Sequence, residues 1–113
     1  MTPLIRNFTM IKGDSKSFGL RFPSITHEIT AIYISCSKNP GTGNYIFQKS
    51  LGNGIELSDD PNNPNVYIVN IAASDTRGCE SGEYYYDIQL EDSTDVITVC
   101  SGTLTLEPWV TKA

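Results

Sequence analysis

The sequence contains a single histidine, His27, which lies three residues after Ser24 and one residue before Glu28. A hydroxyl, an imidazole and a carboxylate are the groups that a nucleophilic hydrolase combines. Residues this close together in one loop rarely direct their side chains at each other, and no nucleophile-elbow motif accompanies them. The sequence therefore predicts a solvated connecting loop at this point, and we expect no catalytic residue in the chain.

Ligands for a metal ion are also sparse. The segment Asp59–Asn65 is rich in oxygen donors that could hold calcium, but Pro61, Pro64 and the lack of a downstream bidentate Glu break the EF-hand pattern. One histidine and three widely spaced cysteines do not form a zinc motif. We predict a surface turn over Asp59–Asn65, with no metal and no cofactor.

The cysteines are Cys36, Cys79 and Cys100, an odd number at long spacings, which is not typical of a disulfide framework. Free thiols are the expected state. Cys36 and Cys100 fall within strand-like runs, where a thiol usually behaves as a small buried hydrophobic group. A disulfide between strands is the alternative.

Aromatic side chains are the strongest candidates for a binding role. In Tyr84-Tyr85-Tyr86 the alternation of a strand must turn Tyr85 outward while its two neighbours point inward. An outward Tyr85 beside Tyr33 or Tyr45 could form a contact patch, although ordinary decoration of a sheet is the alternative. Trp109, in the C-terminal tail, either packs on its own domain or docks onto a neighbour. The candidate interface residues are therefore Tyr33, Tyr45, Tyr85 and Trp109.

The elements that must position these residues are strands. Apolar residues recur at every second position in short runs separated by Gly, Pro, Asn and Asp. Seven such runs span residues 5–12, 15–22, 29–38, 45–49, 66–72, 82–92 and 96–107. A single helical turn is expected over Ser74–Gly78, a brief further strand at Ile55 and Leu57, and a bulge at Gly102.

Strands at roughly ten-residue intervals without intervening helices predict an all-β fold, an antiparallel two-sheet sandwich of about seven strands. Its architecture is expected to be immunoglobulin-like in outline only. The third run lacks the Trp of immunoglobulin domains, and no Cys pair joins the second and sixth runs. At 113 residues, we expect one domain over residues 1–113.

The net charge of the chain disfavours some classes of binding partner. Eight Lys and Arg against thirteen Asp and Glu give a formal net charge of −5, which repels nucleic acid and anionic membrane surfaces. No apolar run approaches the length of about 20 residues that spans a bilayer, and the N-terminus does not read as a signal peptide. We therefore expect no nucleic acid or membrane partner, and synthesis in a cytoplasm.

Three segments together resemble a phage module, the N-terminal domain of upper baseplate proteins and related immunoglobulin-like virion proteins. These segments are Phe8–Phe18 with its Gly13-Asp14 turn, Ser74–Thr76 followed by Ser81–Leu90, and Ser101–Leu106. The resemblance implies a noncatalytic structural protein of a phage or prophage, in a baseplate, tail or other virion component. It further implies contacts with other virion subunits or with copies of itself, localisation in the virion, and synthesis in the bacterial host cytoplasm.

A function of a different class stays open. In a carbohydrate- or ligand-binding β-sandwich, Tyr33, Tyr45 and Tyr85 would stack on sugar rings. A flat row of exposed rings beside Asp or Asn would favour sugar binding, whereas an apolar patch with a polar rim would favour protein assembly.

Overall fold

The computed structural model describes residues 4–21, 29–59, 61–62 and 66–110. These residues form nine strands and one short helix. In chain order they are β1 (Leu4–Ile5), β2 (Phe8–Ile11), β3 (Lys16–Arg21), β4 (Ala31–Ser37), β5 (Phe47–Leu51), β6 (Gly54–Leu57), β7 (Val66–Ile71), α1 (Ala73–Arg77), β8 (Gly82–Glu91) and β9 (Val96–Glu107). His27, Ser24, Glu28 and most of the predicted oxygen-rich turn lie outside the described residues.

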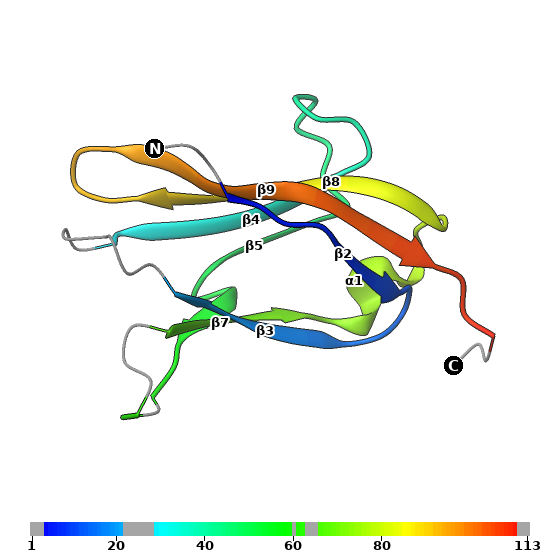
Figure 1. The fold of residues 1–113 in the computed structure, drawn as a ribbon, viewed down its shortest axis with the longest axis horizontal. Coiled ribbons are helices and arrows are strands. Elements are labelled where there is room, and N and C mark those ends of the chain that lie inside the picture. The colour runs from blue at the N-terminus through cyan, green and yellow to red at the C-terminus, as the bar shows by residue number, and fades with distance from the viewer. Residues whose placement is uncertain (1–3, 22–28, 60, 63–65, 111–113) are drawn as a thin grey trace.

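The strands lie in two layers (Figure 1). One layer contains β9, β8, β4 and β5 in that order, with β1 and β2 both on the free side of β9. The other layer contains β6, β7 and β3. The predicted all-β class is confirmed. β4 forms a hairpin with β5 and lies between β8 and β5.

The prediction of two separate sheets is only partly right, because a single curled sheet forms both layers. β5 leads from one layer to the other and pairs with β6 through Ser50 opposite Gly54 and Leu51 opposite Ile55. The turn between them uses Gly52 and Gly54 at φ of 86° and 97°, which residues with a side chain rarely adopt. The sheet is therefore continuous at this bend, and it leaves an open seam between β3 and the β1–β2 edge.

The run predicted as one strand over residues 5–12 is divided into β1 and β2, which both pair parallel with β9. The division lies where the carbonyl of Arg6 passes over Gly102. A Cβ atom at position 102 would lie 1.8 Å from that oxygen. Gly102 is therefore required for a close backbone approach and is not the predicted bulge. The register shift falls instead between Ile88, opposite Cys100, and Gln89, opposite Thr98.

The β2–β3 connection crosses from one layer to the other, since β2 pairs with β9 and β3 with β7. The single-turn helix α1 supports this crossing. The hydroxyl of fully buried Thr76 accepts a 2.8 Å hydrogen bond from the N–H of Gly13. The predicted helical turn is confirmed, although it begins earlier than expected, with the carboxylate of Asp75 accepting a 2.7 Å hydrogen bond from the N–H of Ala72.

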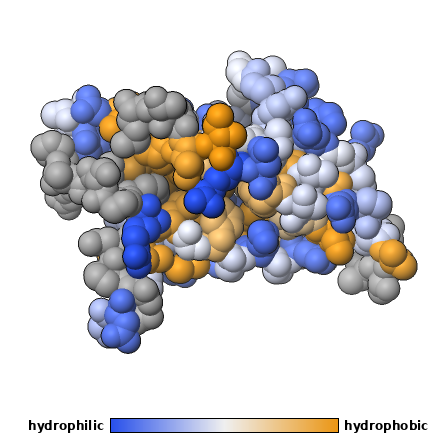
Figure 2. Space-filling model, in the orientation of Figure 1, coloured by the Kyte–Doolittle hydropathy of each residue, from blue (hydrophilic) through white to orange (hydrophobic). Residues whose placement is uncertain are grey.

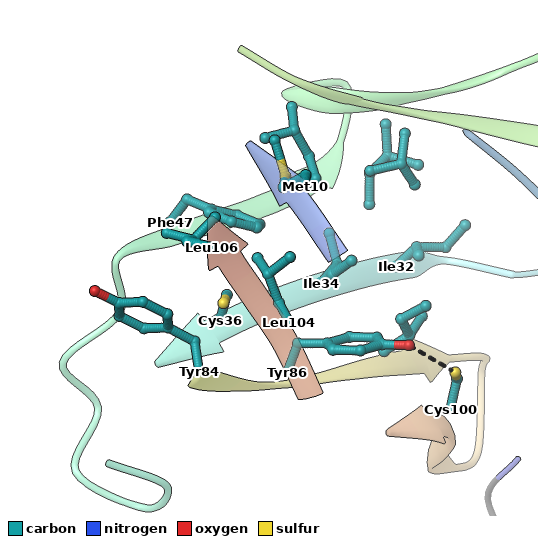
Figure 3. Packing of buried hydrophobic residues seen from close by; sticks show 14 of the residues in the cluster. Met10, Ile32, Ile34, Cys36, Phe47, Tyr84, Tyr86, Cys100, Leu104 and Leu106 are labelled. Atoms are coloured by element: carbon teal, nitrogen blue, oxygen red, sulfur yellow. Dashed lines mark hydrogen bonds between the residues drawn. The ribbon is translucent and has the colours of Figure 1, made fainter. Parts of the chain in front are cut away.

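The core fills the space between the layers, as alternation predicts for β4 and β8. Figure 3 shows side chains of β4, β8 and β9 gathered beneath Met10 and Phe47. The buried hydrophobic residues on these three strands are Ile32, Ile34, Cys36, Tyr84, Tyr86, Ile88, Leu90, Cys100, Leu104 and Leu106. The prediction that Cys36 and Cys100 are free and buried is confirmed.

Tyr84 reveals an immunoglobulin-like feature that the sequence analysis missed. Its hydroxyl donates a 2.7 Å hydrogen bond to the backbone carbonyl of Glu80. A tyrosine near the start of a late strand that bonds back to the preceding backbone is the tyrosine corner of immunoglobulin-type sandwiches. The Trp and the Cys pair of immunoglobulin domains are not needed for this feature. The signal in the sequence that could have indicated the tyrosine corner is a tyrosine shortly after the helical turn.

Candidate binding face

Three of the four predicted interface residues lie around one shallow hollow of about 1010 Å³ on the outer surface of the larger layer. The tyrosine face, as we name it, comprises Tyr33, Ser35, Ser37, Tyr45, Gln48, Tyr85, Asp87, Gln89, Ser101 and Thr103. Tyr45 is 50% and Tyr85 44% exposed, while Tyr33 is half-buried. The tertiary structure thus brings together tyrosines from three separate segments.

Strand register explains this gathering. Ser37 of β4 lies opposite Tyr85 of β8, and Tyr33 lies opposite Gln89. Because successive residues of a strand alternate between faces, placing Tyr84 and Tyr86 in the core obliges Tyr85 to point outward. Tyr33 and Ser37 are four residues apart, so Tyr33 and Tyr85 stand about 13 Å apart along the strands.

The loop between β4 and β5 forms one wall of the hollow. The N–H of Asn39 donates a 3.2 Å hydrogen bond to the hydroxyl of Ser37, which in turn lies 2.9 Å from the carbonyl oxygen of Asn44. The hydroxyl of Thr42 donates a 2.9 Å bond to the carbonyl of Asn39. These local bonds hold the loop that carries Tyr45 beside the sheet.

The electrostatic character of the tyrosine face is acidic. Burial raises the pKa of Asp87 above its ordinary value of 3.8. Asp87 lies between Ser101 of β9 and Ser35 of β4 in register, and Glu91 lines the same hollow. The described residues that line the hollow include no Lys or Arg. A cationic or neutral partner therefore suits this face better than an acidic one.

The two described carboxylates that line the hollow, Asp87 and Glu91, are widely spaced along their strand. Glycosidases place two carboxyl groups about 5–9.5 Å apart. Asp87 and Glu91 are four residues apart on β8, which separates their backbones by about 13 Å. Tyrosine rings with Ser, Gln and Thr around them offer apolar contact area and adaptable hydrogen bonds.

Trp109 lies elsewhere, on the β2–β3 turn. Two atoms of its ring lie 2.9 and 3.0 Å from the position that a Cβ atom of residue 13 would take. The ammonium of Lys12 lies 4.6 Å from the centre of the indole ring. Trp109 therefore packs on its own domain, apart from the tyrosine face, and its role as an interface residue stays a prediction.

Metal-binding groups, reactive thiols and membrane-spanning helices are the other features that could indicate a function in the described part of the chain. There, no three His, Cys, Asp or Glu side chains gather into a group that could hold a metal ion. Burial raises the pKa of the Cys36 thiol to about 12, which keeps it protonated and unreactive at neutral pH. The described portion also contains no helix of the length and apolarity that a membrane span requires.

Comparison with known proteins yields a likeness of fold only. No protein-family model and no curated protein matches the sequence. Among solved structures the chain is similar to CopC from Methylosinus trichosporium OB3b, with a TM-score of 0.50 and 14% identity over 93% of this chain and 87% of that one.

Two further solved structures are similar at lower scores. The natural cytotoxicity receptor NKp44 has a TM-score of 0.46 and 13% identity, covering 96% of this chain and all of that one. The extracellular domain of the voltage-gated sodium channel beta4 subunit has a TM-score of 0.45 and 14% identity, covering 97% of each chain. At such identities, the likeness to CopC describes the backbone fold and transfers no residue role to this chain.

Proposed function

We propose that this protein is a noncatalytic binding subunit that contacts neighbouring protein subunits through its tyrosine face. The observation that carries the proposal is the convergence of Tyr33, Tyr45 and Tyr85 on one hollow. Tyrosine is enriched at protein interfaces because it contributes a large apolar area and a hydroxyl at low cost in conformational entropy. The surrounding Ser, Gly, Asn and Gln residues give the face a composition like that of antibody paratopes.

The finer proposal is a structural protein of a phage or prophage, located in a baseplate, tail or other virion component. It rests on the resemblance of residues 8–18, 74–76, 81–90 and 101–106 to the phage module. The partners would be other virion subunits or further copies of this chain. Because the tyrosine face contains Asp87 and no basic residue, a copy would meet it with a different surface, in a head-to-tail arrangement.

A second candidate function, carbohydrate binding, is favoured by one observation. Asp87, Gln48 and Gln89 lie on the same face as the exposed rings, so hydrogen-bonding groups accompany the aromatic surfaces. Neutral sugars would also avoid any conflict with the acidic character of the face. The two candidates use the same residues and differ in the ligand.

Light scattering at several protein concentrations tests the assembly proposal. We expect an oligomer that dissociates in the double variant Tyr45→Ala/Tyr85→Ala, because truncation of a central interface tyrosine typically weakens binding about tenfold or more. Leu57→Ala, at a 56% exposed residue of β6, is the matched control and should keep the oligomer.

Calorimetric titration with cellohexaose and chitohexaose tests the second candidate. A strict monomer that binds either oligosaccharide, and loses this binding in the double tyrosine variant, would replace protein assembly by carbohydrate binding. A stable oligomer that is unaffected by the double variant would contradict the assignment of the tyrosine face.

A further inference from the structure

We propose that the open seam between β3 and the β1–β2 edge is a second binding site, which accepts an extended segment of a partner protein as an additional strand beside β3. The segment would alternate apolar side chains, directed into the seam, with acidic side chains at its border. The site lies away from the tyrosine face and does not depend on the function proposed for that face.

The first observation is the position of β3 in the sheet. β3 (Lys16–Arg21) is the last strand of the sheet order and pairs with β7 alone among the described strands. The strands at the opposite end, β1 and β2, pair with β9 and not with β3. With respect to the described residues, one side of β3 therefore presents backbone N–H and C=O groups to a further strand. An extended peptide binds such an edge through main-chain hydrogen bonds.

The second observation is an apolar cleft beside that edge, with a volume of about 660 Å³. Phe8, Phe18, Leu20 and Val99 line it, and each is only partly buried against the core. The ring centres of Phe8 and Phe18 lie 6.0 Å apart. Figure 2 shows apolar surface between the two layers at this side of the molecule. The described residues therefore cover the core incompletely along the seam, where alternate side chains of an added strand would complete it.

The third observation is charge. Arg6, Lys16 and Arg21 line the cleft, and none of the described lining residues is Asp or Glu. This cationic group contrasts with the formal net charge of −5 of the whole chain. Cations at the border of an apolar cleft favour a partner segment with acidic residues between its apolar ones, and they disfavour a basic segment.

A fatty acid or another amphipathic anion could also exploit an apolar cleft with cations at its border. It would leave the backbone groups of the β3 edge without a role, however, whereas a strand uses the edge, the apolar lining and the cations together. The observations therefore favour a peptide strand. β3 has six residues, so a segment of about eight residues covers its length of about 20 Å.

Amide chemical shifts and hydrogen exchange of the full chain, measured by NMR with three acetylated octapeptides, test the proposal. The first peptide alternates Val and Glu, the second alternates Val and Lys, and the third is the first with alternate backbone nitrogens methylated. We expect the Val/Glu peptide to protect amides of residues 17–21 and to bind more tightly than the Val/Lys peptide. The methylated peptide should lose most of this binding, because it cannot complete the ladder.

Variants that reverse the charge of cationic residues test the role of charge at the seam, and a charge reversal elsewhere on the surface is the control. Arg6→Glu/Lys16→Glu should weaken binding of the Val/Glu peptide about fivefold or more and strengthen that of the Val/Lys peptide. Lys38→Glu changes a lysine that contacts Tyr84 on another part of the surface, and should have no effect. Tyr85→Ala should also bind the peptide normally, which separates this site from the tyrosine face.

Three outcomes would overturn the proposal. These are no protection of β3 amides by the Val/Glu peptide, equal binding of the methylated peptide, or no change of preference in the charge-reversed variant with a native spectrum. Chemical shift changes at Phe8, Phe18 and Leu20 with decanoate, but not with the peptides, would identify the cleft as a site for an amphipathic anion instead.

Discussion

The hydroxyl of Tyr86 donates a 2.7 Å hydrogen bond to the backbone carbonyl of Arg6, 80 residues away in the sequence. This carbonyl lies between β1 and β2, directly over Gly102. Because Leu4 and Ile5 are exposed, little apolar burial holds the first strand in place. Backbone and side-chain hydrogen bonds to β8 and β9 therefore attach the N-terminal segment to the core.

Tyr86→Phe removes the donor of this bond and leaves the Arg6 carbonyl without it. We expect the free energy of unfolding in urea to fall by about 1–2 kcal/mol, the cost of losing a partly buried hydrogen bond and leaving its acceptor without this donor. Tyr85→Phe, at the adjacent exposed position of β8, should leave the free energy nearly unchanged. Equal effects of the two substitutions would contradict the structural role of the Tyr86 hydroxyl.

Gly102→Ala should displace the N-terminal segment, because the new Cβ atom would lie 1.8 Å from the Arg6 carbonyl oxygen. We expect a loss of about 1–3 kcal/mol of stability and faster amide exchange at residue 103, whose N–H donates to Asn7. Gly78→Ala is the matched control, since a Cβ there meets no atom within 4 Å. Retained protection at residue 103 would show that the close approach does not exist.

Stability should decline at alkaline pH because of Cys36. Burial raises the pKa of this thiol from 9.0 to about 12, so the unfolded chain releases the proton at lower pH than the folded chain. The stabilisation is complete below pH 9 and is lost as the pH rises toward 12, with a slope approaching about 1.4 kcal/mol per pH unit.

Urea unfolding at pH 7 to 11 measures this slope. Burial also raises the pKa values of Tyr84, Tyr86 and Cys79, so the informative quantity is the difference between the native chain and Cys36→Ala. Cys36→Ala should be less stable at pH 7, because it leaves a cavity, but should lose less stability as the pH rises. Parallel curves would contradict the assignment to Cys36.

Thr76→Val should loosen the β2–β3 turn. The hydroxyl of Thr76 accepts the 2.8 Å hydrogen bond from the Gly13 N–H, and valine has the same shape without the acceptor. Because Trp109 is the only tryptophan and packs on Gly13, its fluorescence reports on the turn. We expect a red-shifted emission and a stability loss of about 1–3 kcal/mol. Thr105→Val on β9 is the control and should leave the emission unchanged.

Local patterns in the sequence predicted most of the elements. The alternation of β4 and β8 identified which side chains enter the core, and it also required Tyr85 to face outward. The helical turn and the buried state of Cys36 and Cys100 followed from the same kind of local signal. Such features depend on periods of two or on turn residues, which a single segment carries in itself.

Relations between distant segments required the tertiary structure. The sequence alone could not show that β5 pairs with β6 and joins the layers into one sheet, or that Gly102 lies under Arg6. It proposed a contact patch of Tyr85 with Tyr33 or Tyr45 but not the hollow that all three line, and it did not indicate the cationic seam beside β3. These features arise from strand order and register, which depend on contacts between residues far apart in the chain and are not encoded in the period of any one segment.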